Sequence, residues 1–166
     1  MNWKEIIRDF LLPSMSRSFA FRLVGVGLSA WLFFGYVCIP LRIRGESMEP
    51  TYHDGGFNFC QRVSYLLTKP QRFDVVGVKL SGNRVMLLKR IVAFGGETVE
   101  FRNGRLRVNG VLLDEPYLQF PSDWTLTPRH VKPNNVYVVG DNRSTAIQTH
   151  QFGQTPIRRI VGKILW

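Results

Sequence analysis

Two side chains in this sequence could carry out acyl-transfer chemistry together, the hydroxyl of Ser47 and the amine of Lys89. Ser47 lies in the segment GESMEPTY, residues 45–52, where Pro50 fixes its own φ and biases the preceding residue away from helix. We therefore expect the serine on an extended segment or turn that holds its hydroxyl in place. A serine nucleophile needs a base, and a lysine becomes one when burial lowers its pKa enough to leave the amine neutral.

Lys89 stands in an apolar run, LLKRIV at residues 87–92, that has the composition of a β-strand. The period-two alternation of a strand places Leu87, Lys89 and Ile91 on one face. Ionisation of the lysine is disfavoured if that face is buried, whereas a lysine on an edge strand usually faces water. The presence of Ser47 favours the buried arrangement, and we predict that the two residues act as a pair.

Length and charge limit the class of protein. The chain has 166 residues, enough for one domain and an anchor, and a formal net charge of +10. Such a basic surface suits nucleic acid or anionic lipid, but the basic residues are scattered and no nucleic-acid motif is present. We expect a lipid bilayer and no nucleic acid as partner. Cys38 and Cys60 lack metal-ligand spacing and are not expected to form a disulfide.

An uncharged apolar segment, residues 23–41, follows a basic flank at residues 1–22. Its length is about that of a helix that crosses a bilayer once. The residues near its end are too bulky for a signal-peptide cleavage site, and Val37 is too large to precede a lipid-modified Cys38. We predict an uncleaved single-pass anchor in the cell's inner (cytoplasmic) membrane, with the basic flank in the cytoplasm and a catalytic domain, residues 42–166, outside.

The rest of the chain predicts a mostly β domain of antiparallel sheets and hairpins. Runs that alternate or are rich in β-branched residues predict strands at residues 41–44, 73–80, 85–92, 98–102, 105–108, 111–113 and 136–139. Residues 81–83 predict a hairpin loop, and Asn-Gly pairs at 103–104 and 109–110 predict tight turns. Residues 114–135 contain four prolines and are expected to form an extended excursion over the surface.

The order of short motifs resembles that of the type I signal peptidases, membrane-bound serine–lysine proteases that remove signal peptides from exported proteins. The segments that carry the resemblance are SMEPT (47–51), FDVV (73–76), KRIV (89–92), GGE (95–97), VNG (108–110), EPY (115–117) and GDNR (140–143). Each motif alone is unspecific, but their order and spacing together are specific. The family also includes proteases that mature conjugation pilins and inner-membrane peptidases of organelles.

The resemblance implies Ser47 as the acylating nucleophile, Lys89 as the general base and the Ser47 backbone N–H as the oxyanion donor. It also implies substrates that are exported preproteins with small residues at the first and third positions before the cut. No cluster of His, Cys, Asp or Glu in the sequence has metal-ligand spacing and no Gly-rich loop precedes a predicted helix, so no metal or nucleotide cofactor is expected. The matching pocket positions, for which core packing is the alternative, are Leu41, Ile43, Met48, Tyr52, Leu87 and Leu88. The residues expected to support the site are Arg90, Asp141, Asn142 and Arg143.

The stretch after Arg143 departs from the family's pattern. The family usually has a serine that hydrogen-bonds the lysine, and here that position is Ala146, which cannot orient an amine. Its Asp-Ser-Arg triplet is replaced by residues 148–150, Gln-Thr-His. Ser144, Thr145 or Thr149 could supply the missing hydroxyl.

The three histidines, His53, His130 and His150, are scattered, and nothing in the sequence places one beside Ser47 with an orienting acid. A histidine base is therefore not expected.

Other functions remain open on the sequence alone. One is a specialised processing protease of the same family, such as the pilin-maturing kind. Another is a catalytically silent β domain, tethered to a membrane, that binds exported segments or lipid. Self-cleaving SOS-repressor proteases share a serine–lysine pair, but they carry a DNA-binding domain and lack an anchor such as residues 23–41. A single anchor without an obvious dimerisation stripe predicts a monomer.

Overall fold

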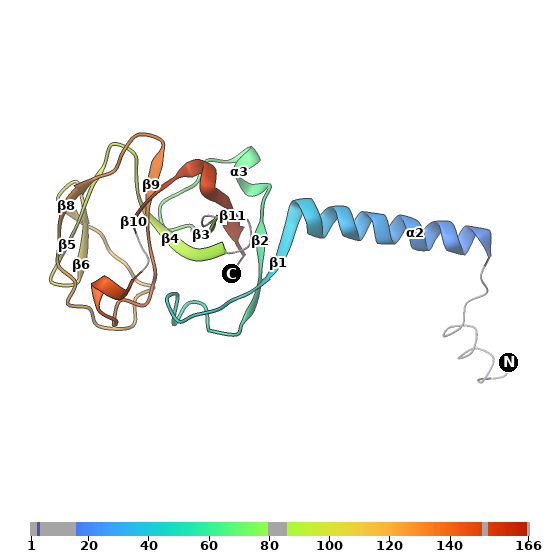
Figure 1. Ribbon diagram of the computed structural model, residues 1–166, viewed down its shortest axis with the longest axis horizontal. Helices are drawn as coiled ribbons and strands as arrows, with labels where there is room; N and C mark the ends of the chain where they lie inside the picture. The colour runs from blue at the N-terminus through green and yellow to red at the C-terminus, as the bar shows by residue number, and fades with distance from the viewer. Residues whose placement is uncertain (1–2, 4–15, 80–85, 151–152, 166) are drawn as a thin grey trace. The chain divides into compact units, whose positions relative to one another are not determined.

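The computed structural model describes residue 3 and residues 16–79, 86–150 and 153–165 (Figure 1). It divides the chain into two compact units, Met1–Val37 and Cys38–Trp166. Most of the basic flank predicted at residues 1–22, and the predicted loop at 81–83, lie outside the described residues. The mostly β, antiparallel fold with one apolar helix near the N-terminus is confirmed.

The first unit contains helix α2 (Arg17–Leu32), which continues as the π-helix η1 (Phe33–Val37). Ser16 caps α2, since its hydroxyl accepts the N–H of Phe19 at 3.2 Å. Together α2 and η1 have the length and composition to cross a membrane once. Large apolar side chains such as Phe21 and Val26 are exposed along this helix, as expected of one that contacts lipid.

The predicted bounds of the anchor, residues 23–41, need correction at both ends. The helix begins at Arg17, because arginines near a helix end can extend their charged groups toward water without ending the helix. At the other end, strand β1 (Cys38–Arg42) already begins at Cys38 and pairs with β2. Pro40 is tolerated there because β1 is the edge strand of its sheet.

The second unit contains a seven-stranded antiparallel sheet in the order β1-β2-β11-β3-β4-β9-β10. Its other strands are β2 (Phe57–Gln61), β3 (Val75–Lys79), β4 (Met86–Phe94), β9 (Asn135–Val139), β10 (Gly153–Pro156) and β11 (Ile160–Ile164). A short helix, α3 (Ser64–Leu67), follows β2, and the 3-10 turns η2 (Ile147–Thr149) and η3 (Ile157–Arg159) flank β10. The predicted pairing of the strands now seen as β3 and β4 is confirmed, with Val76 opposite Lys89.

A four-stranded antiparallel sheet, in the order β7-β6-β5-β8, completes the domain. Its strands are β5 (Thr98–Arg102), β6 (Arg105–Val108), β7 (Val111–Leu112) and β8 (Leu126–His130). Asn103 and Asn109 have φ of 49° and 52°, and each precedes a glycine with positive φ, which confirms the two tight turns. Strand β8 corrects the expectation of a simple excursion over residues 114–135, because Leu126–His130 pairs with β5.

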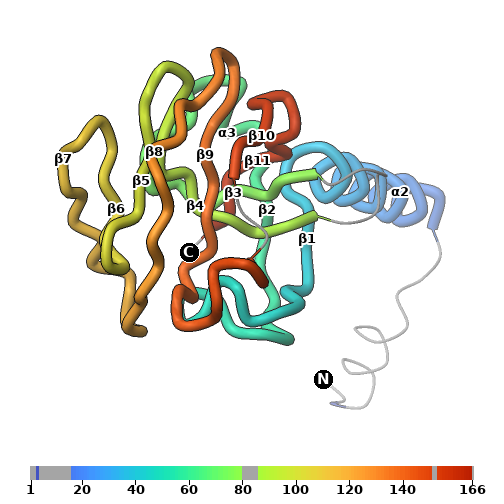
Figure 2. The backbone as a smooth tube through the Cα atoms, turned by 60° about the vertical axis from the view of Figure 1, so that its left-hand side comes forward, coloured from blue at the N-terminus to red at the C-terminus, as the bar shows by residue number. Residues whose placement is uncertain are grey.

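The two sheets enclose the main hydrophobic core, and Figures 1 and 2 show β5, β6 and β8 beside β4 and β9. Val92 and Ala93 of β4 pack with Phe101 of β5 and with Trp124 in this core. A register shift between Ile91 and Ala93 marks a β-bulge, which lets two consecutive residues of β4 join one core. Strand β4 therefore belongs to the centre of the domain, and it is the strand that carries Lys89.

Candidate active site

Ser47 and Lys89, 42 residues apart in sequence, meet in the structure. Lys89 Nζ donates a hydrogen bond of 2.7 Å to Ser47 Oγ. Lys89 extends from β4, between β3 and β9, and only 2% of its surface is exposed. Ser47 lies in the turn segment between β1 and β2, as its neighbourhood to Pro50 predicts. The fold therefore brings into contact the two residues that the sequence predicts to act as a pair.

The environment of Lys89 favours a neutral amine. Burial lowers the pKa of Lys89 to about 8, and the nearby carboxylate of Asp141 opposes part of this effect. About a tenth of the amine is then unprotonated at pH 7, compared with a negligible share for an exposed lysine. A neutral amine in contact with Ser47 Oγ can accept the hydroxyl proton, which is the condition for a serine nucleophile.

The backbone around Ser47 is held by Asn142. The Asn142 N–H donates to the Ser47 carbonyl at 3.0 Å, and its side-chain amide donates to the Glu46 carbonyl at 3.1 Å. Gly140 passes so close that a methyl group on it would overlap the Ser47 carbonyl oxygen. On the other side, Gly45 adopts a left-handed φ of 91° and donates its N–H to Asp54 at 2.7 Å. The serine is therefore fixed from both flanks.

Asp141 joins the strand of Lys89 to the segment of Ser47. Arg90 binds Asp141 through two hydrogen bonds, Nε to Oδ1 at 2.9 Å and Nη2 to Oδ2 at 2.5 Å. Thr51 Oγ1 donates to Asp141 Oδ2 at 2.6 Å. The Arg90 guanidinium also lies 3.9 Å from the centroid of the Tyr117 ring. Such a bidentate, buried pair restricts how β4 and the turn after Ser47 can move relative to each other.

Arg143 supports the same region from the core. It is fully buried and donates to the Gly140 carbonyl at 2.7 Å and to Glu115 Oε1 at 2.8 Å. Its guanidinium lies 5.2 Å from the ring centroid of Phe101 and 5.7 Å from that of Trp124. Of the four residues expected to support the site, Asn142 binds the backbone at Ser47 and Glu46, Arg90 and Asp141 join β4 to the segment of Ser47, and Arg143 binds the Gly140 carbonyl.

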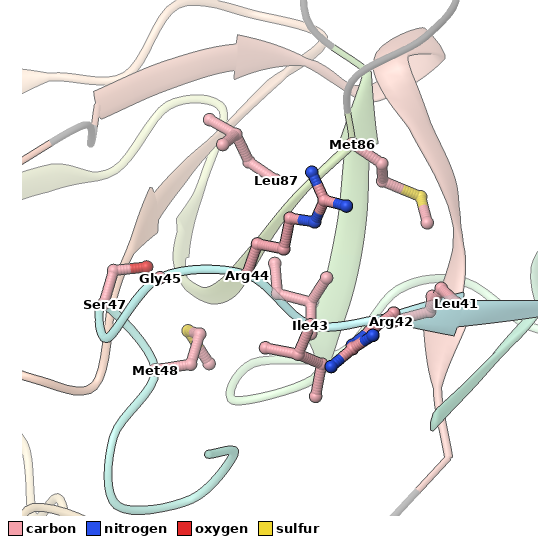
Figure 3. A pocket seen from close by; sticks show the side chains of 10 residues that line it. Leu41, Arg42, Ile43, Arg44, Gly45, Ser47, Met48, Met86 and Leu87 are labelled. Carbon is pink, nitrogen blue, oxygen red and sulfur yellow. The ribbon is translucent and has the colours of Figure 1, made fainter. Parts of the chain in front are cut away.

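A cleft of about 460 Å³ opens beside Ser47 (Figure 3). It is lined by Leu41, Arg42, Ile43, Arg44, Gly45, Ser47, Met48, Met86, Leu87 and Leu88. Five of the six predicted pocket residues are among them. The exception is Tyr52, which is 7% exposed and packs with Ile43 and Met48 in the core behind the cleft. The sequence analysis did not include Arg42, Arg44 or Met86, because it considered only positions known from the family.

A second pocket, of about 320 Å³, contains both residues of the dyad. It is lined by Arg44, Gly45, Glu46, Ser47, Leu87, Lys89, Asn142, Thr145, Thr149 and His150. Within the described part of the chain, Ser47 Oγ is the only hydrogen-bond partner of Lys89 Nζ. Two of the hydroxyls proposed to replace the missing serine donate elsewhere, Ser144 to Asn142 and Thr149 to the Ala146 carbonyl. Thr145 lines the pocket but makes no hydrogen bond to the Lys89 amine.

Of the three histidines, His150 lies in the pocket of the dyad, without an acidic partner among the residues described. Its ring packs edge-on against Trp124, with centroids 4.6 Å apart, and its buried Nδ1 has no hydrogen-bond partner among the residues described. Burial, with the positive charges of Lys89 and Arg143, lowers the pKa of His150 to about 4, while a hydrogen bond to the Asn142 backbone opposes the shift. His150 is thus neutral at pH 7. Because no hydrogen bond links it to Ser47, Lys89 remains the residue placed to act as base.

The low pKa of His150 predicts a pH-dependent stability. Below about pH 6.5 the unfolded chain binds a proton at this histidine and the folded chain does not, so stability is present above that pH and is lost toward pH 4. We expect the fall in Tm between neutral and mildly acidic pH to be smaller in His150→Gln than in the wild type. Thermal unfolding over this range measures the difference, and parallel curves for the two proteins would contradict the burial of a neutral imidazole.

No group of three or more His, Cys, Asp or Glu side chains within the described ranges has a geometry that could hold a metal ion.

The chain belongs to the signal peptidase family, peptidase S26, whose family model matches residues 16–166. Thylakoidal processing peptidase 1 of Arabidopsis thaliana is 35% identical over 80% of this chain and 42% of its own length. Signal peptidase I of Leptolyngbya laminosa is 31% identical over 83% of this chain and 73% of its own length. Signal peptidase I of Bacillus caldolyticus is 30% identical over 81% of this chain and 86% of its own length. The resemblance read from the motifs is confirmed.

The chain spans about two fifths of the length of the two chloroplast relatives it matches. Among solved structures, a signal peptidase I from Enterococcus faecalis V583 aligns with a TM-score of 0.49 and 28% identity, over 59% of this chain and 98% of that chain. Membership of this family, together with the apolar helix Arg17–Val37, indicates a membrane-anchored protein.

Proposed function

We propose that this chain is a membrane-anchored serine endopeptidase that removes N-terminal signal peptides from exported preproteins. The observation that carries the proposal is the hydrogen bond of 2.7 Å between the buried Lys89 amine and Ser47 Oγ. The family and the names of its relatives support the substrate class. A silent binding domain would not need a buried lysine in contact with a serine, since burying an amine costs free energy.

The dyad supports acylation in the following way. The neutral Lys89 amine takes the Ser47 proton while Oγ attacks the scissile carbonyl carbon. The oxygen of that carbonyl becomes an oxyanion, for which we propose the Ser47 backbone N–H as donor; no described residue accepts a hydrogen bond from it. The Lys89 ammonium then gives its proton to the leaving amine as the peptide bond breaks, leaving an acyl ester on Ser47 and a neutral lysine.

Deacylation repeats these roles with water. Lys89 takes a proton from a water molecule in the pocket that it shares with Ser47, and the resulting hydroxide attacks the ester carbon. The ester bond breaks, and Ser47 Oγ recovers a proton from the Lys89 ammonium. The side chains of Arg90, Asp141 and Asn142 take no proton in this scheme; they hold the dyad and its backbone in place.

The cleft beside Ser47 suits the small residues that precede signal-peptide cleavage sites. Its apolar side chains, including Leu41, Ile43 and Leu88, leave about 460 Å³ for an extended peptide. We place the protein in the cytoplasmic membrane as a single-pass monomer, with its N-terminus in the cytoplasm and residues 38–166 outside. Arg17 and Arg22 near the N-terminal end of the helix support this orientation.

The location of the cut tests this function. A detergent-solubilised preprotein with an Ala-x-Ala site is expected to give two products whose masses place cleavage directly after the second alanine. The same preprotein with tryptophan in place of that alanine serves as control and is expected to resist, because the substrates that we propose carry a small residue at this position. Equal cleavage of both preproteins, or cleavage at scattered sites, would contradict the proposal.

The pKa of Lys89 predicts the pH dependence of the reaction. The unprotonated amine is the active form, so kcat/KM is expected to rise about tenfold per pH unit up to about pH 8 and to level off above it. A steady-state profile between about pH 6 and pH 10 measures this limb. A profile that stays flat over this range would instead assign the base to a group that is already deprotonated at pH 6, such as His150.

A further inference from the structure

The cleft beside Ser47 has an unbalanced charge. Two of its ten lining residues are arginines, Arg42 and Arg44, and none is acidic. The six residues that precede Met86 in the sequence, 80–85, also contain no Asp or Glu. The remaining lining is mainly apolar. A peptide that enters this cleft therefore meets positive charge on an apolar wall.

Arg44 is the arginine best placed to meet such a peptide. It lines both the cleft and the pocket of the dyad, three residues before Ser47. In Figure 3 its side chain extends toward Leu87 and Met86. Arg42 takes another direction, since its Nη2 lies 4.0 Å from the position of a Cβ on Gly55.

The guanidinium of Arg44 is not neutralised by the protein. It is exposed and makes no ion pair or hydrogen bond with any residue described. Glu46, two residues away, shares the dyad pocket with Arg44 but makes no ion pair with it. Two further acids have other partners: Asp54 accepts the Gly45 N–H at 2.7 Å, and Glu49 binds His53 at 2.6 Å. Glu46 lines the dyad pocket but not the cleft.

We propose that Arg44 binds a carboxylate of the substrate, so that the enzyme prefers a peptide with Asp or Glu between the two small residues that enter the cleft. This inference rests on the proposed function and adds a specificity determinant to it. In an extended peptide successive side chains point to opposite sides. When the first and third residues before the cut enter the cleft, the second points out toward its rim, where the exposed guanidinium of Arg44 can pair with it.

A charge exchange tests the pairing. Preproteins with Ala-Asp-Ala, Ala-Asn-Ala and Ala-Lys-Ala sites are compared in detergent with uncharged headgroups, using the wild type, Arg44→Glu and Arg105→Glu. The control removes an exposed arginine of β6, outside both pockets of the site, and changes the net charge by the same amount. We expect the wild type to cleave the Asp site about fivefold faster than the Asn site, in kcat/KM, with less preference at high salt. Arg44→Glu is expected to cleave the Lys site faster than the Asp site, and Arg105→Glu is expected to keep the preference of the wild type for the Asp site.

The remaining outcomes separate this inference from the function it rests on. Cleavage of all three sites by the wild type without a charge preference, or the same order in Arg44→Glu, would overturn the pairing and leave the protease intact. An effect of Arg44→Glu that appears only with anionic lipid vesicles would assign the anion to lipid headgroups and also overturn it. If no site is cleaved, binding of the three peptides to Ser47→Ala decides the question: tighter binding of the Asp peptide supports the pairing, and equal binding contradicts it.

Discussion

Lys89→Ala and Lys89→Arg are each expected to lower kcat/KM by at least about 10³-fold. In the first variant no amine remains to take the Ser47 proton. In the second the guanidinium stays protonated at any working pH, so it can donate a hydrogen bond but cannot act as a base. The loss should appear in kcat, because Lys89 contacts Ser47 Oγ and lines the dyad pocket, but it is absent from the residues that line the substrate cleft.

The matched control is Lys79→Arg, the same substitution at an exposed lysine at the end of β3. This variant is expected to keep the wild-type rate. Steady-state cleavage of one preprotein by the four proteins, with circular dichroism to verify folding, measures the effect. Wild-type activity in Lys89→Arg would remove the lysine from the mechanism, whereas activity that is lost in Lys89→Ala but kept in Lys89→Arg would assign it a purely electrostatic role.

Arg143→Ala is expected to lower the free energy of unfolding by roughly 3–5 kcal/mol. The substitution leaves Glu115, whose side chain is 5% exposed, without its ion-pair partner and opens a cavity beside Phe101 and Trp124. It also removes the hydrogen bond to the carbonyl of Gly140, whose backbone packs against Ser47. Urea unfolding of the detergent-solubilised protein measures the change.

Arg102→Ala is the matched control for this stability prediction. Arg102 also pairs with a glutamate, Glu100 at 3.4 Å, but its side chain is 65% exposed. Surface pairs of this kind contribute about 0–1 kcal/mol, so Arg102→Ala is expected to change the free energy of unfolding only by that amount. Equal effects of the two substitutions would show that burial of the Arg143–Glu115 pair does not determine its importance.

The dyad could be predicted from the sequence because its two halves have local signatures. Pro50 indicates an irregular segment for Ser47, and period-two alternation puts Leu87 and Lys89 on one face, where both line the dyad pocket. The two Asn-Gly turns could be predicted for the same reason, since each depends only on two neighbouring residues that tolerate positive φ.

The elements that were missed depend on distant partners. Strand β8 contains Pro128, which is compatible with a strand only because β8 lies at the edge of its sheet. Strand β11 contains Gly162, where a side chain would overlap the Gln61 carbonyl of the neighbouring β2. The sequence shows a proline and a glycine at these places, and the reason each is accepted lies in another strand.

The positions of Tyr52 and His150 in the site also depend on residues that are distant in the sequence. Tyr52 is apolar enough for either a pocket or the core, and only the packing of Ile43 and Met48 against it selects the core. His150 lies beside the dyad because residues after β9 turn back past Gly140, a path that no local pattern specifies. Arg44 was not among the predicted pocket residues, because these were the positions that match the family's pocket.

Ser47 is the proposed nucleophile of a peptidase, and one comparison of two proteins tests this role. Wild type and Ser47→Ala are incubated in parallel with the same preprotein carrying an Ala-x-Ala site. The dyad predicts that the wild type cleaves it and that Ser47→Ala does not, because Lys89 then has no hydroxyl from which to take a proton. Cleavage by Ser47→Ala at the wild-type rate would contradict the account and assign the activity to another residue.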